Sequence, residues 1–400
     1  MIAFEAAYRI VLENYTSFGE ETVPLQESLG KLLAEAIVAD RDFPPYDRST
    51  RDGIAIRYTD SQAGASSLPI QGIAYAGEPQ MQLQNDGACI EIMTGAILPS
   101  GTDTVVMYEH LKIEKGYATL MQPVLNGQNI HKKGSDTQKG AVVLEKGTTI
   151  GPAAIGVLAA VGKTEVLVKK LPKIAIVSTG NELVPPEASP EPHQIRTSNS
   201  FTLAAALKKE QITGTLFHFS DDKERIRTGL EQVVRGFDVI LVSGGVSKGK
   251  YDFLPTVLES LGVDQLFHRV KQRPGKPFWF GKHQAMRTTI FAFPGNPGST
   301  FANYHVYFLP WLCKSLGVQI NRPHIRLNEA FENNTDLTRF IRVNAYLNSN
   351  ELCANLVKAN GSGDLTSLVT TSGFTILPPN TKYEGGELLP FIPTEKIFHQ

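Results

Sequence analysis

Hydrophobic and polar positions change their period several times along the chain. Between residues 173 and 316, short apolar runs rich in β-branched side chains alternate with stretches in which apolar residues recur at helical spacing. The predicted strands are 173–178, 238–243 and 288–293, and the predicted helices are 201–210, 222–234, 253–261 and 299–316. Strands separated by single helices are typical of parallel βαβ units, so we expect a parallel sheet here.

The flanking regions have other patterns. Apolar residues at helical spacing predict helices over 1–15, 25–39 and 150–161. Residues 47–136 contain short β-rich segments separated by Gly, Pro and Asn, which predict a small β domain with strands at 88–92 and 104–107. Beyond Arg322-Pro323 the chain is β-rich again, with strands predicted at 339–347 and 374–377.

The predicted fold class is a multidomain α/β protein, in which a parallel-sheet domain follows a helical and β-containing N-terminal region and precedes a C-terminal β domain. The predicted domains are a discontinuous helical N-terminal and linker domain (1–46 and 137–172), a small β-rich domain (47–136), an α/β domain (173–320) and a C-terminal β domain (321–400).

Composition excludes several classes of function. The 39 Lys and Arg residues balance 40 Asp and Glu residues, so the chain lacks the basic field that binds nucleic acid non-specifically. Cys89, Cys313 and Cys353 lie too far apart for a CxxC metal site and give no disulfide framework, which favours a reducing cytoplasmic location. The N-terminus does not follow the order of a signal peptide, and the apolar run 150–161 is too short for a bilayer, so we expect no membrane association.

Polar or glycine-rich loops follow three of the predicted strands. These loops are 178–182 (STGNE), 243–252 (SGGVSKGKYD) and 294–299 (PGNPGS). Ligands of α/β sheets bind outside the carboxyl ends of the strands, where these loops meet. Glycines directly after a buried strand let backbone N–H groups approach an anion closely, so the sequence predicts a phosphate site.

Each of these loops also has a simpler interpretation. The spacing from Gly244 to Lys250 nearly matches a P-loop, but Tyr251 stands where a P-loop has the hydroxyl residue that reaches Mg²⁺, so an NTPase is disfavoured. An isolated glycine-rich loop is often only a tight turn. The segment 294–297 would equally serve as a rigid turn, with Ser299 or Thr300 capping the next helix.

Seven motifs in order, spread over nearly the whole chain, resemble those of the molybdopterin molybdenumtransferase family, which includes the insertase domain of gephyrin. The motifs are 47–55 (DRSTRDGIA), 92–96 (IMTGA), 127–130 (GQNI), 178–183 (STGNEL), the glycine loop 242–252, 274–277 (PGKP) and 294–297 (PGNP). Seven ordered motifs at compatible spacings are far more specific than any one of them.

The resemblance implies an enzyme that takes adenylylated molybdopterin and molybdate as substrates. Members hydrolyse the pyrophosphate link in a step that depends on Mg²⁺ and release molybdenum cofactor and AMP. They are homodimers with four domains per chain, in which the α/β domain of one subunit and the N-terminal region of its partner form the cleft. The resemblance also implies contacts with molybdopterin adenylyltransferase and with apo-molybdoenzymes.

The resemblance assigns residues to this site. The catalytic carboxylates are Asp52, Asp136, Asp221, Asp252 and Glu182, and Asp221 and Asp252 are the predicted ligands of Mg²⁺, which prefers oxygen donors. The predicted substrate-binding residues are Thr94, Ser178, Thr179, Gly180, Ser243, Gly244, Gly245, Ser247, Arg269, Arg273, Lys276, Pro294, Pro297 and Ser362. Ser362 and Ser367 belong to a Gly-Ser-Gly-x-Leu-x-Ser-Leu segment that resembles the family's last motif.

The sequence departs from the family pattern at several of these positions. Asn181 stands where Asp is usual, Lys250 where an acidic residue is usual, and His131 where Arg is frequent, while Arg269 and Arg273 replace lysines. Two alternatives therefore stay open beside the insertase: an adenylyltransferase that joins ATP to molybdopterin, and a non-catalytic scaffold of the kind that gephyrin provides. The sequence does not distinguish molybdate from tungstate.

Overall fold

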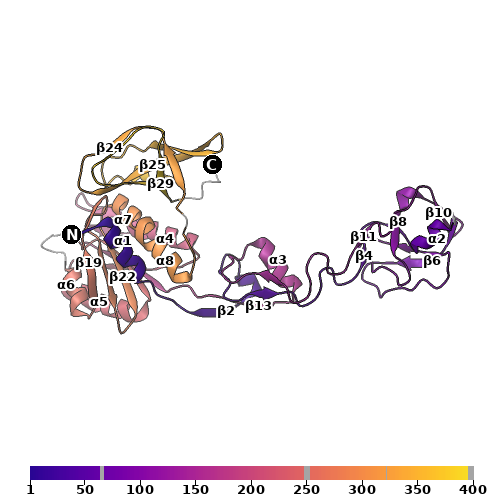
Figure 1. Cartoon of the computed structure of the whole chain (residues 1–400). Helices are drawn as coiled ribbons and strands as arrows, with labels where there is room; N and C mark the ends of the chain where they lie inside the picture. Colours follow the sequence, from indigo (N-terminus) through magenta and orange to yellow (C-terminus); the bar gives the residue numbers. More distant parts are fainter. Residues whose placement is uncertain (64–66, 247–252, 321, 395–400) are drawn as a thin grey trace. The chain divides into compact units, whose positions relative to one another are not determined.

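The computed structural model describes residues 1–63, 67–246, 253–320 and 322–394, and the chain divides into two compact units (Figure 1). The first unit comprises 1–21 and 169–400, and the second comprises 22–168. The chain enters the second unit within β2 (Glu20–Pro24) and leaves it within β13 (Glu165–Lys169). The finer division into four domains stays a prediction. The predicted site residues Ser247 and Asp252, and Lys250, lie outside the described residues.

A six-stranded, mostly parallel sheet forms the centre of the first unit, which confirms the predicted α/β fold. In sheet order, its strands are β17 (Thr215–Phe219), β14 (Ile174–Thr179), β18 (Val239–Ser243), β22 (Thr288–Phe293), β21 (Trp279–His283) and β19 (Asp264–His268). The first four run parallel, and β21 and β19 are antiparallel additions at one edge. Neither β17 nor the antiparallel pair was predicted, because the mixed polar sequences of β17 and β19 lack the long apolar run of a central strand.

Helices cover both faces of this sheet (Figure 1). Alternate residues of the central strands point to opposite faces, so that Ile176 packs with one set of helices and Val177 with the other. One face carries α1 (Phe4–Glu13), α4 (Asn199–Lys209), α7 (Pro297–Asn303) and α8 (Leu309–Leu316), and the other carries α5 (Lys223–Gly236) and α6 (Leu254–Ser260). The helix predicted at 299–316 is confirmed, with a π-helical turn at Tyr304–Phe308 just before Pro310, which has no N–H for the helical ladder.

The C-terminal part of the first unit is a closed β-barrel. Its strands pair in the order β25, β26, β23, β29 and β27, and β27 pairs again with β25 to close the ring. The strand bounds are β23 (His324–Leu327), β25 (Thr338–Asn348), β26 (Glu351–Leu356), β27 (Gly373–Leu377) and β29 (Leu388–Pro393), with the short pair β24 (Phe331–Asn333) and β28 (Thr381–Tyr383) beside them. The strand β20 (Val270–Arg273) leaves the α/β domain and pairs in parallel with β25, so a loop of that domain is held against the barrel.

The second unit contains a six-stranded sheet and a separate small core. In sheet order, the strands are β8 (Thr104–Met107), β5 (Gly53–Ile56), β7 (Cys89–Ile92), β6 (Ser67–Ala74), β10 (Tyr117–Leu120) and β9 (Leu111–Glu114). The smaller core gathers Leu33, Ile37 and Leu158 around α3 (Pro152–Ala160). Other elements of this unit are α2 (Tyr58–Gln62), β3 (Ile37–Val38), β12 (Val142–Leu144), β4 (Arg48–Ser49) and β11 (Ile130–His131).

The helix predicted over 25–39 is wrong. The segment forms a single 3₁₀ turn at Leu25–Glu27 and then runs irregularly into β3. Gly30 adopts a φ of 77°, which ends any helix, and the backbone N–H of Leu33 donates to the Thr148 carbonyl instead of to a helical partner. Leu33 and Ile37 of this segment are buried in the core around α3, with Leu25 partly buried against it. In the described part of the chain, no helix combines the length and apolar character needed to cross a membrane.

Candidate functional site

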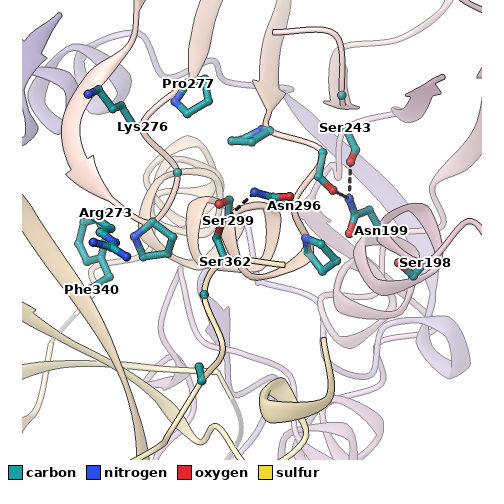
Figure 2. Close-up of a pocket in the computed structure, with 18 of the residues that line it drawn as sticks. Ser198, Asn199, Ser243, Arg273, Lys276, Pro277, Asn296, Ser299, Phe340 and Ser362 are labelled. Atoms are coloured by element: carbon teal, nitrogen blue, oxygen red, sulfur yellow. Dashed lines mark hydrogen bonds between the residues drawn. The ribbon is translucent and has the colours of Figure 1, made fainter. Parts of the chain in front are cut away.

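A cavity of about 910 Å³ lies at the carboxyl ends of β14, β18 and β22, with the barrel as its other wall (Figure 2). Most of the residues predicted for the first unit line it. These are Ser178, Thr179, Gly180, Glu182, Asp221, Ser243, Gly244, Gly245, Arg273, Lys276, Pro294, Pro297 and Ser362. The convergence of the three loops is therefore seen in the structure, while the individual roles of these residues stay predictions.

The glycine loop after β18 is shaped for close approach of a ligand. Gly244 and Gly245 have φ values of 103° and 69°, which L side chains rarely adopt. A Cβ atom at Gly245 would also lie 3.0 Å from Thr179 Oγ1, so a larger residue would have to displace a neighbouring atom. That hydroxyl is buried and has no hydrogen-bond partner among the described residues. The loop therefore offers an open concave surface and one unused polar group.

Asn199 joins the glycine loop to the proline-rich turn after β22. Its Nδ2 group donates to Ser243 Oγ at 2.7 Å and to the carbonyl of Gly295 at 2.6 Å (Figure 2). Asn199 begins α4, and sequence reasoning missed it because a polar residue at a helix start is usually only a cap. The only sequence feature that could have pointed to Asn199 is the polar run 197–200 before an apolar helix.

Two carboxylates lie on the cavity wall beside β14. The backbone N–H of Asn181 donates to Asp221 Oδ2 at 3.3 Å, and Asn181 Oδ1 accepts from the backbone N–H of Asp221 at 3.0 Å. Asn181 thus fixes the loop that carries Asp221. Glu182 folds back so that its carboxylate occupies the space that a Cβ atom would take at Gly180.

The donors on this wall fit a hard divalent cation. Asp221 and Glu182 present carboxylate oxygens along one side of the cavity, and oxygen is the donor that Mg²⁺ prefers. Within the described ranges, no three acidic, His or Cys side chains are grouped closely enough to hold a metal by themselves. The second predicted ligand, Asp252, lies outside those ranges.

Cationic side chains gather on the opposite wall. Strand pairing of β20 with β25 places Arg273 directly beside Arg339, and Lys276 lies three residues further along the same loop. Burial lowers the pKa of Arg339, and the neighbouring charge of Arg273 lowers the pKa further. Arg339 Nε is buried with no partner in the described structure, and its guanidinium lies 4.8 Å from the centre of the Phe331 ring. Two adjacent arginines, Arg273 exposed and Arg339 partly buried, with no carboxylate partner among the described residues, favour a site for an oxyanion.

The loop that carries Ser362 is attached to the start of α7. The backbone N–H of Gly298 donates to the Ser362 carbonyl at 2.9 Å, and Asn296 Nδ2 donates to Ser362 Oγ at 2.9 Å (Figure 2). Arg342, in β25, donates from Nη1 to the Asp364 carbonyl at 2.9 Å and to Ser367 Oγ. Ser367 therefore supports the loop from behind, whereas Ser362 faces the cavity.

We expect Gly298→Ala to destabilise this attachment. The new Cβ atom would occupy the position of Arg342 Nη2, which is buried and engaged with the 360–367 loop. Overpacking of this kind costs about 1–3 kcal/mol, so chemical denaturation should show a lower free energy of unfolding. Gly295→Ala is the matched control, since its Cβ would meet nothing closer than 3.9 Å. Equal stability of the two variants would refute the stated packing at Gly298.

Arg269 does not line the cavity, although it was predicted to bind substrate. It has a φ of 72° just before β20, where its backbone N–H donates to the Phe278 carbonyl at 2.9 Å. Its own carbonyl accepts from the Ile2 N–H at 3.1 Å. The observed contacts of Arg269 thus shape the backbone that leads into the cationic loop.

A second group of predicted residues meets within the second unit. Asp52 Oδ1 accepts from the backbone N–H of Thr94 at 2.6 Å and from Thr94 Oγ1 at 2.8 Å. His131 Nε2 lies 2.8 Å from Asp136 Oδ1, and Arg48 Nη2 lies 3.3 Å from His131 Nδ1. Because a guanidinium only donates, Nδ1 must accept and the Nε2–H group donates to Asp136. The structure thus pairs Asp52 with Thr94 and Asp136 with His131.

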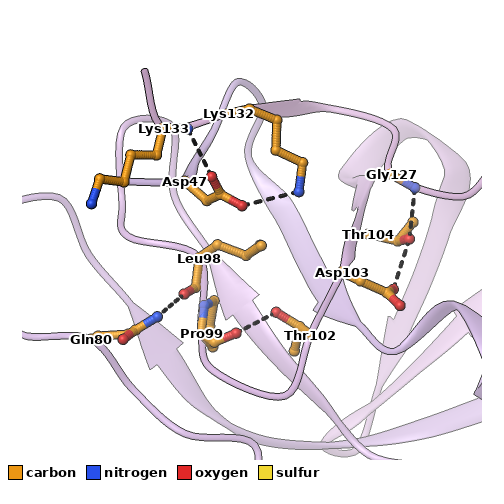
Figure 3. A network of polar contacts seen from close by, with 10 residues as sticks. All are labelled: Asp47, Gln80, Leu98, Pro99, Thr102, Asp103, Thr104, Gly127, Lys132 and Lys133. Atoms are coloured by element: carbon orange, nitrogen blue, oxygen red, sulfur yellow. Dashed lines mark hydrogen bonds and ion pairs between the residues drawn. The ribbon is translucent and has the colours of Figure 1, made fainter. Parts of the chain in front are cut away.

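A polar network supports the loops of this second group (Figure 3). Asp47 accepts from Lys132 Nζ at 3.0 Å and from the backbone N–H of Lys133 at 2.8 Å. Burial acts to raise the pKa of Asp47, but these two donors outweigh it and lower the pKa overall. The backbone N–H of Gly127 donates to Thr104 Oγ1 at 3.1 Å. The network connects the motif at 47–55 with the segment that follows the motif at 127–130.

We expect Thr94→Val to raise the pKa of Asp52. The backbone N–H of Thr94, and then its hydroxyl, hold the pKa of Asp52 below its ordinary value, and valine removes only the hydroxyl. A lowered folded-state pKa stabilises the protein above the unfolded pKa of about 3.9, and this contribution is lost as the pH falls through the folded value. Carbon-detected NMR titration of Asp52 measures the shift, and Thr94→Ser, which keeps the hydroxyl, should titrate like the wild type. Identical titration of the valine variant would show that the hydroxyl does not act on Asp52.

Models of known protein families match nearly the whole chain. Three family models match: the MoeA N-terminal region (domains I and II) at residues 2–162, a probable molybdopterin binding domain at 175–314, and the MoeA C-terminal region (domain IV) at 324–394. The fold is thus that of a protein built around a molybdopterin-binding domain, with MoeA-type regions on either side.

Relatives extend the match to full length. The molybdopterin molybdenumtransferase of Synechocystis sp. is 36% identical over 98% of this chain and 99% of its own, and that of Bacillus subtilis is 33% identical over 96% and 91%. A crystal structure of the molybdopterin biosynthesis MoeA protein from Pyrococcus horikoshii is 30% identical, has a TM-score of 0.81, and covers 98% of this chain and 99% of its own. This chain belongs to the molybdopterin molybdenumtransferase (MoeA) family.

Proposed function

We propose that this protein inserts molybdenum into adenylylated molybdopterin, with Mg²⁺-dependent hydrolysis of the pyrophosphate link and release of AMP and molybdenum cofactor. The observation that carries the proposal is the single cavity that places Asp221 and Glu182 on one wall and Arg273, Lys276 and Arg339 on another. Full-length relatives named molybdopterin molybdenumtransferase support the same reaction.

The walls have separate tasks in this proposal. The open loop at Gly244 and Gly245 admits the phosphate groups. Asp221 and Glu182, with Asp252, would hold Mg²⁺, which supplies charge neutralisation at the phosphate oxygens when bound. Arg273, Lys276 and Arg339 orient the molybdate oxyanion, for which planar guanidinium groups give fixed donor geometry.

The proposal includes a homodimer. Asp52 and Asp136 belong to the second unit, and the cavity belongs to the first. We infer that the second unit of one subunit contributes its Asp52–Thr94 and Asp136–His131 pairs to the cavity of the partner subunit. We further propose a cytoplasmic location, and exchange of substrate and product with molybdopterin adenylyltransferase and with apo-molybdoenzymes.

One experiment separates the insertase from its alternatives. The purified protein is given either adenylylated molybdopterin with Mg²⁺ and molybdate, or molybdopterin with Mg²⁺ and ATP, and nucleotides are quantified by chromatography. The proposal predicts AMP only in the first mixture. Conversion of ATP and molybdopterin to the adenylylated product would identify an adenylyltransferase, and binding of adenylylated molybdopterin without turnover would identify a scaffold.

A further inference from the structure

The cationic loop of the cavity is held from behind by a buried amide. Gln272 is the penultimate residue of β20, directly before Arg273, and its side chain is fully buried. Two residues of the helical segment after the proline-rich turn, Asn303 and Tyr307, are equally buried and lie against it. Because these three polar side chains have no access to water, their hydrogen bonds must be satisfied by one another or by the backbone.

The hydrogen bonds of Gln272 run mainly to the loop backbone. Its Nε2 group lies 3.1 Å from the carbonyl oxygen of Pro274, 3.3 Å from that of Gly275 and 2.9 Å from Asn303 Oδ1. Its Oε1 atom accepts from the Tyr307 hydroxyl. One amide thus fixes two consecutive carbonyl groups between Arg273 and Lys276, the two predicted anion-binding residues of this loop.

The same network connects the loop to a second wall of the cavity. Asn303 ends α7, whose first turn carries Pro297 and Ser299 of the cavity lining. Asn303 also fills the space that a Cβ atom would need at Gly275, where φ is 84°. The position of the cationic loop is therefore set by contact with α7 and not by its own short backbone alone.

We propose that Gln272 is a positioning residue that holds the backbone from Pro274 to Gly275 so that the Arg273 and Lys276 side chains converge on the oxyanion. The inference rests on the proposed function for the identity of that oxyanion, which is molybdate. Gln272 does not neutralise charge itself, since its amide group is hydrogen-bonded to the loop backbone, to Asn303 and to Tyr307. Its effect passes entirely through the two cations.

Gln272→Met tests the proposal, because methionine has a similar volume and no hydrogen-bonding amide. We expect the KM for molybdate to rise about tenfold and kcat to change less than about twofold. The Pro274 carbonyl loses its donor, the Gly275 carbonyl keeps only the 3.5 Å contact from Asn303 Nδ2, and the loop relaxes. The matched control is Gln265→Met, which removes a 2.9 Å hydrogen bond from Trp279 Nε1 in the same domain but does not touch the loop. The control should leave the KM for molybdate unchanged.

A double-mutant cycle with Lys276→Met distinguishes positioning from general destabilisation. If Gln272 acts through the two cations, Gln272→Met should raise the KM for molybdate clearly less than about tenfold once Lys276 is absent, because only Arg273 is left to be displaced. Equal tenfold effects in both backgrounds would overturn the proposal, as would an unchanged KM in Gln272→Met itself. If Gln272→Met fails to fold, Gln272→Glu replaces it, because the glutamate keeps the acceptor for the Tyr307 hydroxyl and loses the amide donor. The same increase in the KM for molybdate is expected for this variant. An unchanged KM would overturn the proposal.

A binding measurement distinguishes failure of the positioning role from failure of the proposed enzymatic function. If the wild-type protein releases no AMP, molybdate binding to wild type and Gln272→Met is measured by calorimetry. A tenfold weaker binding by the variant would support the positioning role without the enzymatic reaction. Equal binding by the two proteins, or no binding by the wild type, would overturn it.

Discussion

Replacement of Asp221 by Asn is expected to lower kcat for molybdate-dependent AMP release by about 10²–10³-fold, because a carboxylate that binds Mg²⁺ acts directly on the charge that develops at the phosphate. Asparagine retains an oxygen for the backbone N–H of Asn181, so the loop geometry should persist. The half-saturating Mg²⁺ concentration should rise in parallel. Steady-state AMP release across a Mg²⁺ titration measures both quantities.

Asp222→Asn is the matched control for this prediction. Asp222 is the adjacent residue, but it caps α5 by accepting from the Arg225 N–H at 2.8 Å and does not line the cavity. Asparagine caps helices as well as aspartate does, so kcat should stay near the wild-type value. A loss in Asp221→Asn of less than about threefold, or an equal loss in the control, would contradict a metal-binding role for Asp221.

Arg339→Met is expected to raise the KM for molybdate by about 10- to 100-fold, since a charge-assisted hydrogen bond to an oxyanion contributes about 1.5–3 kcal/mol. The unliganded protein should lose little stability, because the substitution relieves the repulsion between Arg339 and Arg273 and removes a buried, unpartnered Nε atom. A higher KM without a lower melting temperature therefore marks a ligand site rather than a structural ion pair.

Arg326→Met provides the comparison within the same barrel. Arg326, in β23, forms an ion pair with Glu351, with 2.9 Å between Nε and Oε2, and it does not line the cavity. Its replacement should therefore leave the KM for molybdate unchanged. Arg339→Lys keeps the charge but loses the planar fork, and an intermediate KM is expected. If Arg339→Met lowers the melting temperature while the KM for molybdate stays normal, the arginine stabilises the barrel and does not bind the oxyanion.

The sequence predicted those features that depend on residues close together in the chain. Buried β-branched runs such as 238–243 and the helix from 222 to 234 follow from periodicity, and the loops after the strands were identified from their glycines and hydroxyls. Convergence of those loops follows from the geometry of a parallel sheet. These arguments located the cavity wall around Ser178 and Ser243 without knowledge of the tertiary structure.

The features that sequence reasoning missed depend on contacts between distant segments. Arg339 looks like an ordinary residue of a barrel strand, and only the register of β20 against β25 brings it beside Arg273. Gln272 and Asn199 are common polar residues whose importance comes from the backbone groups that they contact. The apolar spacing at 25–39 failed for the same reason, because those residues pack in a core built by α3 and its neighbouring strands.

The most direct test of the account is the dependence of AMP release on molybdate. Purified wild-type protein is incubated with adenylylated molybdopterin and Mg²⁺ while the molybdate concentration is raised from zero, and AMP and active molybdenum cofactor are measured together. The account predicts negligible AMP without molybdate, a saturable rise with molybdate, and cofactor formed in equal amount to AMP. AMP release that is independent of molybdate, or the absence of AMP at every concentration, would contradict it.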